Sequence, residues 1–384
     1  MSDIKQKSID LHREKKGKLE ITSKVQVKDR NDLSLVYTPG VGAVSELVAE
    51  NPLEAYNLTL KGNTIAIVSD GSAVLGLGNL GALGAIPVME GKAILFKEFA
   101  GLDAFPICLD TQDNDEIIRT VKNIAPVFGG INLEDIAAPR CFEIEERLRK
   151  ELNIPIMHDD QHGTATVVLA GLINSLKLRG SKKEDVKIII NGAGAAGTAI
   201  VKILVDYGFK HFTLCDSKGV ITKDRGDLND EKLKLVSYIE SKTGKYEALA
   251  GNLKSAIVEK DIFIGVSKGN LVDIEMVCSM NEKPIIFAMA NPVPEIMPDI
   301  AKQAGAFVVA TGRSDFPNQV NNVLAFPGIF RGALDNHIKQ FTDEMFLHAA
   351  ENLAACVIDL SIEQILPNPF DKNIVIKIAE AIVD

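Results

Sequence analysis

The sequence predicts an α/β protein of two domains, an N-terminal α/β domain followed by a Rossmann-type, doubly wound domain. Its 384 residues exceed the length of one ordinary domain, so two domains that share a cleft are expected. Short apolar runs alternate with amphipathic stretches along the chain, a pattern typical of parallel sheets covered by helices on both faces. A glycine-rich turn at residues 192–197 follows one of these runs directly, as in the first unit of a doubly wound sheet.

The apolar runs are expected to be strands that are buried on both faces. Such strands show no alternation of apolar and polar residues, because helices cover both sides of the sheet. Apolar residues recur with helical spacing at 115–124 and 142–152, which predicts amphipathic helices there. The expected strands are residues 64–68, 93–96, 106–109, 127–131, 155–157, 187–190, 212–215, 262–265, 284–288 and 307–310.

The stretch at 163–178 is expected to be a buried helix that joins the two halves. It is long, apolar and rich in small residues, and an Arg-Gly pair follows it as a stop signal. Beyond residue 322 the pattern is helical again, at 329–348 and 374–383. We therefore expect an N-terminal domain at 1–162, a Rossmann domain at 163–330, and C-terminal helices at 331–384 that pack back towards the N-terminal domain.

Charge and composition exclude several classes of function. The formal net charge of -10 at pH 7 argues against nucleic acid as a partner. No stretch approaches the roughly 18 apolar residues of a membrane span, and the first residues lack the apolar core of a signal peptide, so we expect a cytoplasmic protein with no membrane partner. The 5 cysteines are widely spread without a C-x-x-C pair, which indicates reduced residues.

The glycine-rich turn has the fingerprint of a dinucleotide-binding site. It follows an expected strand and opens an expected helix at 195–204, the context that the motif requires. Gly192 permits the tight turn, Gly194 lets the backbone approach a pyrophosphate, and Gly197 allows the helix to pack closely on the strand. The motif reads Gly192-Ala193-Gly194-Ala195-Ala196-Gly197.

Asp216 ends the next expected strand, where a carboxylate can accept hydrogen bonds from both ribose hydroxyls of the cofactor. It therefore predicts NAD in preference to NADP. Lys218 works against this preference, because a cation two residues further on can meet a 2′-phosphate. The alternative interpretation of the whole motif is a glycine-rich turn that binds nothing.

Two acidic pairs follow expected strands and are candidates for a metal site. Glu134 and Asp135 come after one strand, and Asp159 and Asp160 come after the next. The carboxyl ends of parallel strands point to one crevice, so three of these side chains can converge on a hard cation such as Mg²⁺ or Mn²⁺. Solvated turns remain the alternative, because acidic pairs in loops are common.

Lys92 and two histidines border these pairs in the sequence. Lys92 precedes the run at 93–96, and burial beside another cation would lower its pKa and make it a base for an alcohol proton. The alternative is a surface lysine, the interpretation that we prefer for Lys97. His158 and His162 have zinc-like spacing but lack the H-E-x-x-H glutamate, so hydrogen-bonding roles are expected.

Several motifs together resemble the malic enzymes, most closely the short bacterial forms. The resemblance covers nearly the whole chain and is specific in the combination rather than in any single motif. The motifs are Tyr37-Thr-Pro-Gly-Val-Gly42, Gly76-Leu-Gly-Asn-Leu-Gly81, Asn132-Leu-Glu-Asp135, His158-Asp-Asp-Gln-His-Gly-Thr164, Asn291-Pro292 and Asn321-Asn-Val-Leu-Ala-Phe-Pro-Gly328.

The resemblance implies a role for each matching residue. Lys92 would be the general base and Tyr37 the general acid. The metal ligands would be Glu134, Asp135 and Asp160, with Asp159 supporting them. Asn291 and Asn322 match asparagines that contact substrate and nicotinamide, and the 192–197 turn matches the family's cofactor loop.

The implied reaction is oxidative decarboxylation of L-malate to pyruvate and CO₂, with NAD, or possible NADP, as hydride acceptor. Lys92 would take the C2 hydroxyl proton, and Tyr37 would protonate C3 after decarboxylation. Larger relatives carry an arginine that binds the substrate carboxylate where Ala73 stands, so the group that binds this carboxylate is not assigned here. The candidates are Ser72, backbone N–H groups of the 76–84 loop and a residue of a partner subunit. Malolactic conversion to lactate and a non-catalytic NAD-binding module are the alternatives, and a homodimer is expected.

Overall fold

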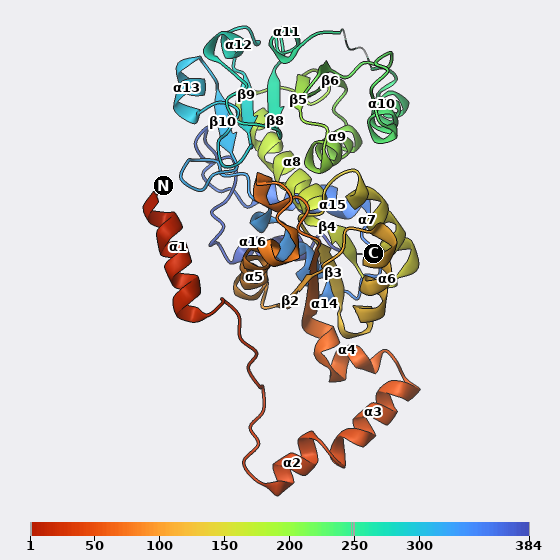
Figure 1. Ribbon diagram of the computed structural model, residues 1–384. Helices are drawn as coiled ribbons and strands as arrows, with labels where there is room; N and C mark the ends of the chain where they lie inside the picture. The colour runs from red at the N-terminus through yellow and green to blue at the C-terminus, as the bar shows by residue number, and fades with distance from the viewer. Residues whose placement is uncertain (1, 247, 249, 384) are drawn as a thin grey trace.

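The structure, a computed structural model, describes residues 2–246, 248 and 250–383. Two separate sheets, one of 4 strands and one of 6, lie one above the other along the molecule, each covered by helices (Figure 1). This architecture confirms the predicted α/β class. None of the described helices is long and apolar enough to cross a membrane.

The first sheet is parallel throughout, and its strand order reverses beside its first strand. The neighbours run in the order β2-β1-β3-β4, so the chain changes direction between β1 and β3. Ligands of open α/β sheets bind at such a reversal, outside the carboxyl ends of the strands. The strands are β1 (Thr64–Ser69), β2 (Asp103–Cys108), β3 (Gly130–Leu133) and β4 (Ile156–His158).

Alternate side chains of β1 enter two different cores. Ile65 packs in the core that contains α5 (Gly81–Ala100), whereas Ala66 packs against α6 (Asn114–Ile124) and α7 (Arg140–Glu151). Both faces of the sheet are therefore covered, which explains why its strands are apolar without alternation.

The second sheet has the strand order of a doubly wound dinucleotide fold. Read from one edge, its order is β7-β6-β5-β8-β9-β10, in which only the pair β6 and β7 is antiparallel. The strands are β5 (Lys187–Asn191), β6 (His211–Asp216), β7 (Gly219–Val220), β8 (Ile262–Gly265), β9 (Ile285–Ala288) and β10 (Val308–Thr311). The helices of this half are α9 (Ala195–Tyr207), α10 (Asp230–Thr243), α11 (Leu253–Ala256), α12 (Ile274–Cys278) and α13 (Pro298–Gln303).

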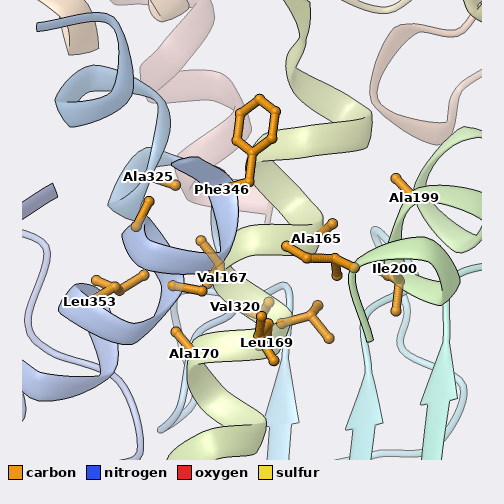
Figure 2. Packing of buried hydrophobic residues seen from close by; sticks show 14 of the residues in the cluster. Ala165, Val167, Leu169, Ala170, Ala199, Ile200, Val320, Ala325, Phe346 and Leu353 are labelled. Atoms are coloured by element: carbon orange, nitrogen blue, oxygen red, sulfur yellow. The ribbon is translucent and has the colours of Figure 1, made fainter. Parts of the chain in front are cut away.

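Helix α8 (Asp159–Arg179) connects the two sheets and is buried along most of its length. Figure 2 shows Val167 and Leu169 of this helix packed among side chains of α9 and of the C-terminal region, such as Ile200 and Leu353. An apolar helix of this kind has partners on several sides, as the composition at 163–178 predicts.

The C-terminal helices lie against α5 and α8. The ring centroids of Phe96 in α5 and Phe326 in α14 are 4.7 Å apart in an edge-to-face arrangement. Phe346 of α15 belongs to the same core as the apolar residues of α8. These helices are α14 (Phe326–Asp335), α15 (Asp343–Ala355) and α16 (Asn373–Ala379).

Residues 30–58, which we call the arm, form three helices before β1. The helices α2 (Arg30–Val36), α3 (Gly40–Glu50) and α4 (Glu54–Leu58) contain no buried residue. Figure 1 shows α2 and α3 in orange-red, extended away from both sheets. Helix α1 (Ser2–Lys15) precedes the arm, and short 3-10 turns occur at η1 (Leu60–Asn63), η2 (Val74–Gly76), η3 (Ala125–Val127) and η4 (Asn322–Leu324).

One expected strand is wrong. Residues 93–96 lie inside α5, where Ala85, Met89, Ala93 and Phe96 are buried at intervals of one helical turn. A four-residue apolar run does not distinguish a strand from the buried face of a helix. The strand expected at 127–131 begins later because η3 occupies its start, and the remaining expected strands overlap observed ones.

Candidate active site

Four carboxylates meet at the carboxyl ends of β3 and β4. Glu134 and Asp135 follow β3, and Asp159 and Asp160 begin α8 directly after β4. The two strands pair in register up to their last residues, so the side chains that follow them are neighbours. Ligand oxygens of Glu134, Asp135 and Asp160 lie within 4.8 Å of one another. The structure thus brings together the three residues expected to bind a cation.

Lys92 reaches the same cluster from the interior of α5, where its side chain is 6% exposed. Its Nζ lies 3.0 Å from Glu134 Oε1 and forms a hydrogen-bonded ion pair with Asp159. It also lies 4.0 Å from the ring centroid of Phe326. Lys92 is therefore not a surface lysine, whereas Lys97, farther along the same helix, is exposed as expected.

The carboxylates together carry more negative charge than Lys92 neutralises. Burial, with repulsion from Asp160, raises the pKa of Asp135 to about 7. Burial also raises the pKa of Glu134 well above its usual value, against the attraction of Lys92. Burial alone would lower the pKa of Lys92, but the charges of Asp159 and Glu134 outweigh it and raise that pKa. The lowered lysine pKa expected from the sequence is thus not observed without a cation.

The donor set fits a hard divalent cation. Oxygen ligands of this kind suit Mg²⁺ or Mn²⁺. Asp135 Oδ2 and Asp159 Oδ1 are buried and have no hydrogen-bond partner in the part of the chain that the structure describes. Asp135 has a left-handed φ of 54°, and its N–H donates to Asp160 Oδ2 at 3.0 Å. Since such a conformation is costly for a residue other than glycine, the local fold holds these oxygens in place.

The two histidines contact Glu145, a buried residue of α7 that sequence reasoning missed. His162 Nε2 lies 2.8 Å from Glu145 Oε1, and the His158 N–H donates to the same oxygen at 3.1 Å. The His162 ring stacks on Phe346 with centroids 4.6 Å apart. The His162 ring thus lies within ion-pair distance of Glu145. Neither ring nitrogen of His158 has a hydrogen-bond partner among the described residues, so the hydrogen-bonding role expected for the His158 side chain is not observed. Nothing in the amphipathic pattern of α7 marks Glu145 as different from its exposed neighbours.

Tyr37 does not reach this cluster within one chain. It lies at the end of α2 on the arm, and its side chain is 67% exposed. Figure 1 shows this part of the arm far from β3 and β4. The proposed acid and the proposed base are therefore separated in the single chain.

Asn291 and Asn322 lie where the two sheets face each other. A Cβ added to Gly76, in the loop after β1, would lie 3.0 Å from the Asn291 carbonyl oxygen, so loops of both sheets meet here. A Cβ added to Gly163, one turn after Asp159, would lie 3.3 Å from Asn322 Cβ. Asn291 therefore lies close to the loop after β1, and Asn322 lies close to the first turns of α8, which carry Asp159 and Asp160.

Glu295 fixes the loop that carries Asn291, and the sequence gives no signal for it. Its side chain is fully buried and accepts hydrogen bonds from the N–H groups of Ser267, at 3.1 Å, and Ala290, at 3.0 Å. These groups follow β8 and β9, so one carboxylate joins the carboxyl ends of both strands.

The 192–197 turn has the close packing that the motif requires. Gly192 has a φ of 123°, and an added Cβ would lie 2.6 Å from the Val266 carbonyl oxygen. A Cβ on Gly197 would overlap the Gly192 carbonyl oxygen, whereas a Cβ on Gly194 would meet nothing within 4 Å. The turn ends at Ala195, where α9 begins, so the N-terminal N–H groups of that helix face the space outside the sheet.

Asp216 lies at the end of β6, as predicted, but it is already paired. Arg225 donates to both of its carboxylate oxygens, at 2.9 and 3.1 Å, and Lys232 Nζ donates to Oδ2 at 2.6 Å. The Lys218 N–H donates to Oδ1 at 2.9 Å, while the Lys218 ammonium pairs with Asp227. Sequence reasoning missed Arg225 and Lys232, because both stand in stretches that look like ordinary charged surface.

Ser72 is not free to bind a substrate carboxylate. Its hydroxyl donates to Asp70 at 2.6 Å and accepts from the Ala137 N–H at 2.8 Å and from Arg140 at 2.9 Å. One donor and two acceptor positions are all that a hydroxyl offers. Of the candidate anchors, the 76–84 loop and a partner subunit therefore remain.

Comparison with known proteins identifies related sequences along almost the whole chain. The family model described as "Malic enzyme, N-terminal domain" matches residues 16–149, and the model "Malic enzyme, NAD binding domain" matches residues 161–384. The bifunctional malic/malolactic enzyme of Bacillus subtilis is 53% identical over 382 residues, which cover 99% of this chain and 92% of that protein.

Two further relatives differ in the cofactor that they are named for. The NADP-dependent malic enzyme of Rhizobium meliloti is 48% identical over 354 residues, which cover 91% of this chain and 45% of that protein. The crystal structure of the NAD-dependent malic enzyme from Thermotoga maritima is 50% identical with a TM-score of 0.93, covering 97% of this chain and 98% of that one.

Two glycine substitutions are expected to separate turn geometry from ligand access. Gly197→Ala should lower the free energy of unfolding by roughly 1–3 kcal/mol, because its Cβ collides with backbone. Gly194→Ala should keep wild-type stability, because its Cβ meets nothing, but should weaken dinucleotide binding by occupying the space of the pyrophosphate. Denaturant titration and calorimetry measure the two effects, and equal stability losses in both variants would contradict this geometry.

Divalent cation binding is expected to weaken as the pH falls. Asp135, with a pKa of about 7, must lose its proton before it can bind a cation. Its folded pKa is raised above the unfolded value, so the cation-free protein should lose stability as the pH rises through about 4 to 7. Mn²⁺ should therefore raise the melting temperature more at about pH 8 than at about pH 6. Asp135→Asn is the control, and a pH-independent Mn²⁺ effect in the wild-type protein would argue against this assignment.

Proposed function

The chain belongs to the malic enzyme family, and from that premise we propose that it converts L-malate to pyruvate and CO₂ with a nicotinamide dinucleotide and Mg²⁺ or Mn²⁺. The observation that carries the proposal is the buried Lys92, paired with Glu134 and Asp159 beside three clustered carboxylates. The second sheet supports it, because its fold and its 192–197 turn are those of a dinucleotide-binding domain.

Glu134, Asp135 and Asp160 would hold the cation, and Asn291 and Asn322 would line the substrate and nicotinamide positions. When bound, the cation stabilises negative charge on the substrate oxygens and the nicotinamide accepts the hydride. Asp160 and Asp135 accept hydrogen bonds from the backbone N–H groups of Asp135 and Leu75, and Glu134 accepts one from the Asn132 side chain. The three carboxylates are thus held before any ligand arrives, so little reorganisation is needed.

Lys92 would act as the base through its contact with Asp159. Burial raises the pKa of Asp159 even against the attraction of Lys92. The carboxylates raise the pKa of Lys92 in turn, so Lys92 would have to give up its proton before its amine could take the C2 hydroxyl proton. Asp159, its hydrogen-bond partner, is the group placed to receive that proton. Asp159 would thus support the base without binding the cation. Tyr37 would then deliver a proton to C3.

A malolactic outcome is a second candidate, favoured by the similarity to the bifunctional enzyme of Bacillus subtilis. The same residues would serve it, but the reduced cofactor would stay bound and reduce pyruvate to lactate. Pyruvate released with an equal amount of reduced cofactor supports the first function, and lactate without net reduced cofactor supports the second.

Lys92→Ala is expected to abolish malate-dependent formation of reduced cofactor, because no other amine contacts Asp159 among the described residues. Dinucleotide affinity should remain, since Lys92 lies outside the second sheet. Absorbance at the reduced-nicotinamide band measures turnover, and calorimetry measures cofactor binding. Lys97→Ala, on the exposed side of the same helix, is the matched control and should keep full activity. Turnover retained by the Lys92 variant would exclude Lys92 as the base.

We further propose that the active form is a homodimer in which each arm supplies Tyr37 to the other subunit. The arm exposes a row of apolar side chains that a monomer would leave in water. They are Leu33, Leu35, Val36, Tyr37, Val41, Val44 and Leu47.

A second apolar surface borders the acidic cluster and is the partner that this arm fits. Leu75, Leu77, Leu80 and Leu83 are all exposed. The Leu75 N–H donates to Asp135 Oδ1 at 3.4 Å, so this surface directly adjoins the expected cation ligands. Covering it with the arm of a second copy buries both surfaces and brings Tyr37 to the site that lacks an acid.

Mixed dimers of Tyr37→Phe and Lys92→Ala subunits test this exchange. Each variant alone should be inactive. The mixed dimer should have about half the wild-type activity, because one site combines an intact Lys92 with the partner's intact Tyr37. A dimer of wild-type and doubly substituted subunits should be inactive. An inactive mixed dimer, together with a half-active dimer of wild-type and doubly substituted subunits, would show that Tyr37 acts within its own subunit.

A further inference from the structure

We propose that this chain uses NADP, and that Arg225 and Lys232 bind the 2′-phosphate of its adenosine ribose. The inference rests on the dinucleotide-dependent function proposed above and specifies the cofactor of that same site. It reverses the preference for NAD that Asp216 alone predicts, and it depends on the surroundings of this carboxylate.

Asp216 has no accepting position left for a ribose diol. A carboxylate offers about four lone-pair directions, and four N–H donors from Lys218, Arg225 and Lys232 already occupy them. To accept the two hydroxyls of NAD, Asp216 would have to lose charge-assisted hydrogen bonds and gain weaker neutral ones. Recognition of NAD by this residue is therefore disfavoured by the contacts it already makes.

The cations around Asp216 outnumber the carboxylates. Lys218, Arg225 and Lys232 face Asp216 and Asp227, which leaves one positive charge in excess. The side chains of Arg225 and Lys232 are only 16% and 24% exposed, so solvent screens them incompletely. A planar guanidinium beside an ammonium is the donor pair that suits a phosphate group.

The two cations are held by different elements, so they form a built site rather than a chance contact. Arg225 follows β7 and also donates to the carbonyl oxygens of Gly219, at 3.3 Å, and Val220, at 3.2 Å. Lys232 lies in the first turn of α10, whose N-terminus is capped by Asn229. Both side chains converge on the end of β6, where the adenosine ribose of a doubly wound fold lies.

The alternative is that Arg225 and Lys232 only neutralise and orient Asp216, which then binds the ribose diol of NAD. Adenosine fragments distinguish the two possibilities without any turnover. Calorimetry would compare adenosine 2′,5′-bisphosphate, its 3′,5′-isomer and 5′-AMP on the wild-type protein. The proposal expects the 2′,5′-isomer to bind roughly tenfold more tightly than either of the others. Equal affinities of the three fragments would overturn it, as would tighter binding of 5′-AMP.

Substitutions then test the named residues. Lys232→Met should remove most of the advantage of the 2′,5′-isomer and leave the affinity for 5′-AMP unchanged. Arg225→Ala should do the same, but it also loses contacts to β7, so Lys232 is the cleaner test. Lys223→Met is the matched control, because Lys223 lies in the same loop and pairs with Glu240 at 2.5 Å instead. An undiminished advantage in the Lys232 variant would remove Lys232 from the site.

Kinetics separates this inference from the proposed function. Malate turnover with NAD at a higher kcat/KM than with NADP would overturn the inference and leave the malic enzyme function intact. Absence of malate turnover with both cofactors, together with tight binding of the 2′,5′-isomer, would overturn the function and support the assignment of Arg225 and Lys232.

Discussion

The crowding of four carboxylates around one buried ammonium is the constraint on which the rest of the site depends. Charges of one sign in a buried place are costly unless something compensates them, and Lys92 compensates only part. The parallel pairing of β3 and β4 enforces the arrangement, because it places the residues after both strands side by side. The stability of the first sheet therefore maintains a charge distribution that favours a divalent cation.

Helix α8 connects the acidic cluster to the main hydrophobic core of the molecule. Its first turn carries Asp159 and Asp160, and its remaining turns are buried between the two sheets and the C-terminal helices (Figure 2). The position of two acidic side chains is thus set by a core that reaches far beyond the site. A change in that core would therefore alter the geometry of the cluster.

Local patterns in the sequence predicted the features that depend on neighbouring residues, namely most strands and the glycine-rich turn. Continuous apolar runs identified most strands, and the glycine spacing identified a turn whose packing leaves no room for a Cβ at Gly192 or Gly197. The run at 93–96 failed because it is one face of a longer helix. The pairing of Arg225 and Lys232 with Asp216 was missed because both stand in stretches that look like ordinary charged surface. The distance of Tyr37 from Lys92 was missed because it depends on where remote segments lie in space. Glu145 and Glu295 were missed because nothing in the pattern around them marks either carboxylate as buried.

The surroundings of Lys92 and of Asp216 have opposite charge excesses. Carboxylates exceed cations around Lys92, whereas cations exceed carboxylates around Asp216. A chain with a net charge of -10 would repel an anionic ligand in general, whereas the local positive excess at the end of β6 favours one there. The carboxylate excess around Lys92 favours a cation there by the same reasoning. The positions of both charge excesses thus follow from where β3, β4 and β6 end.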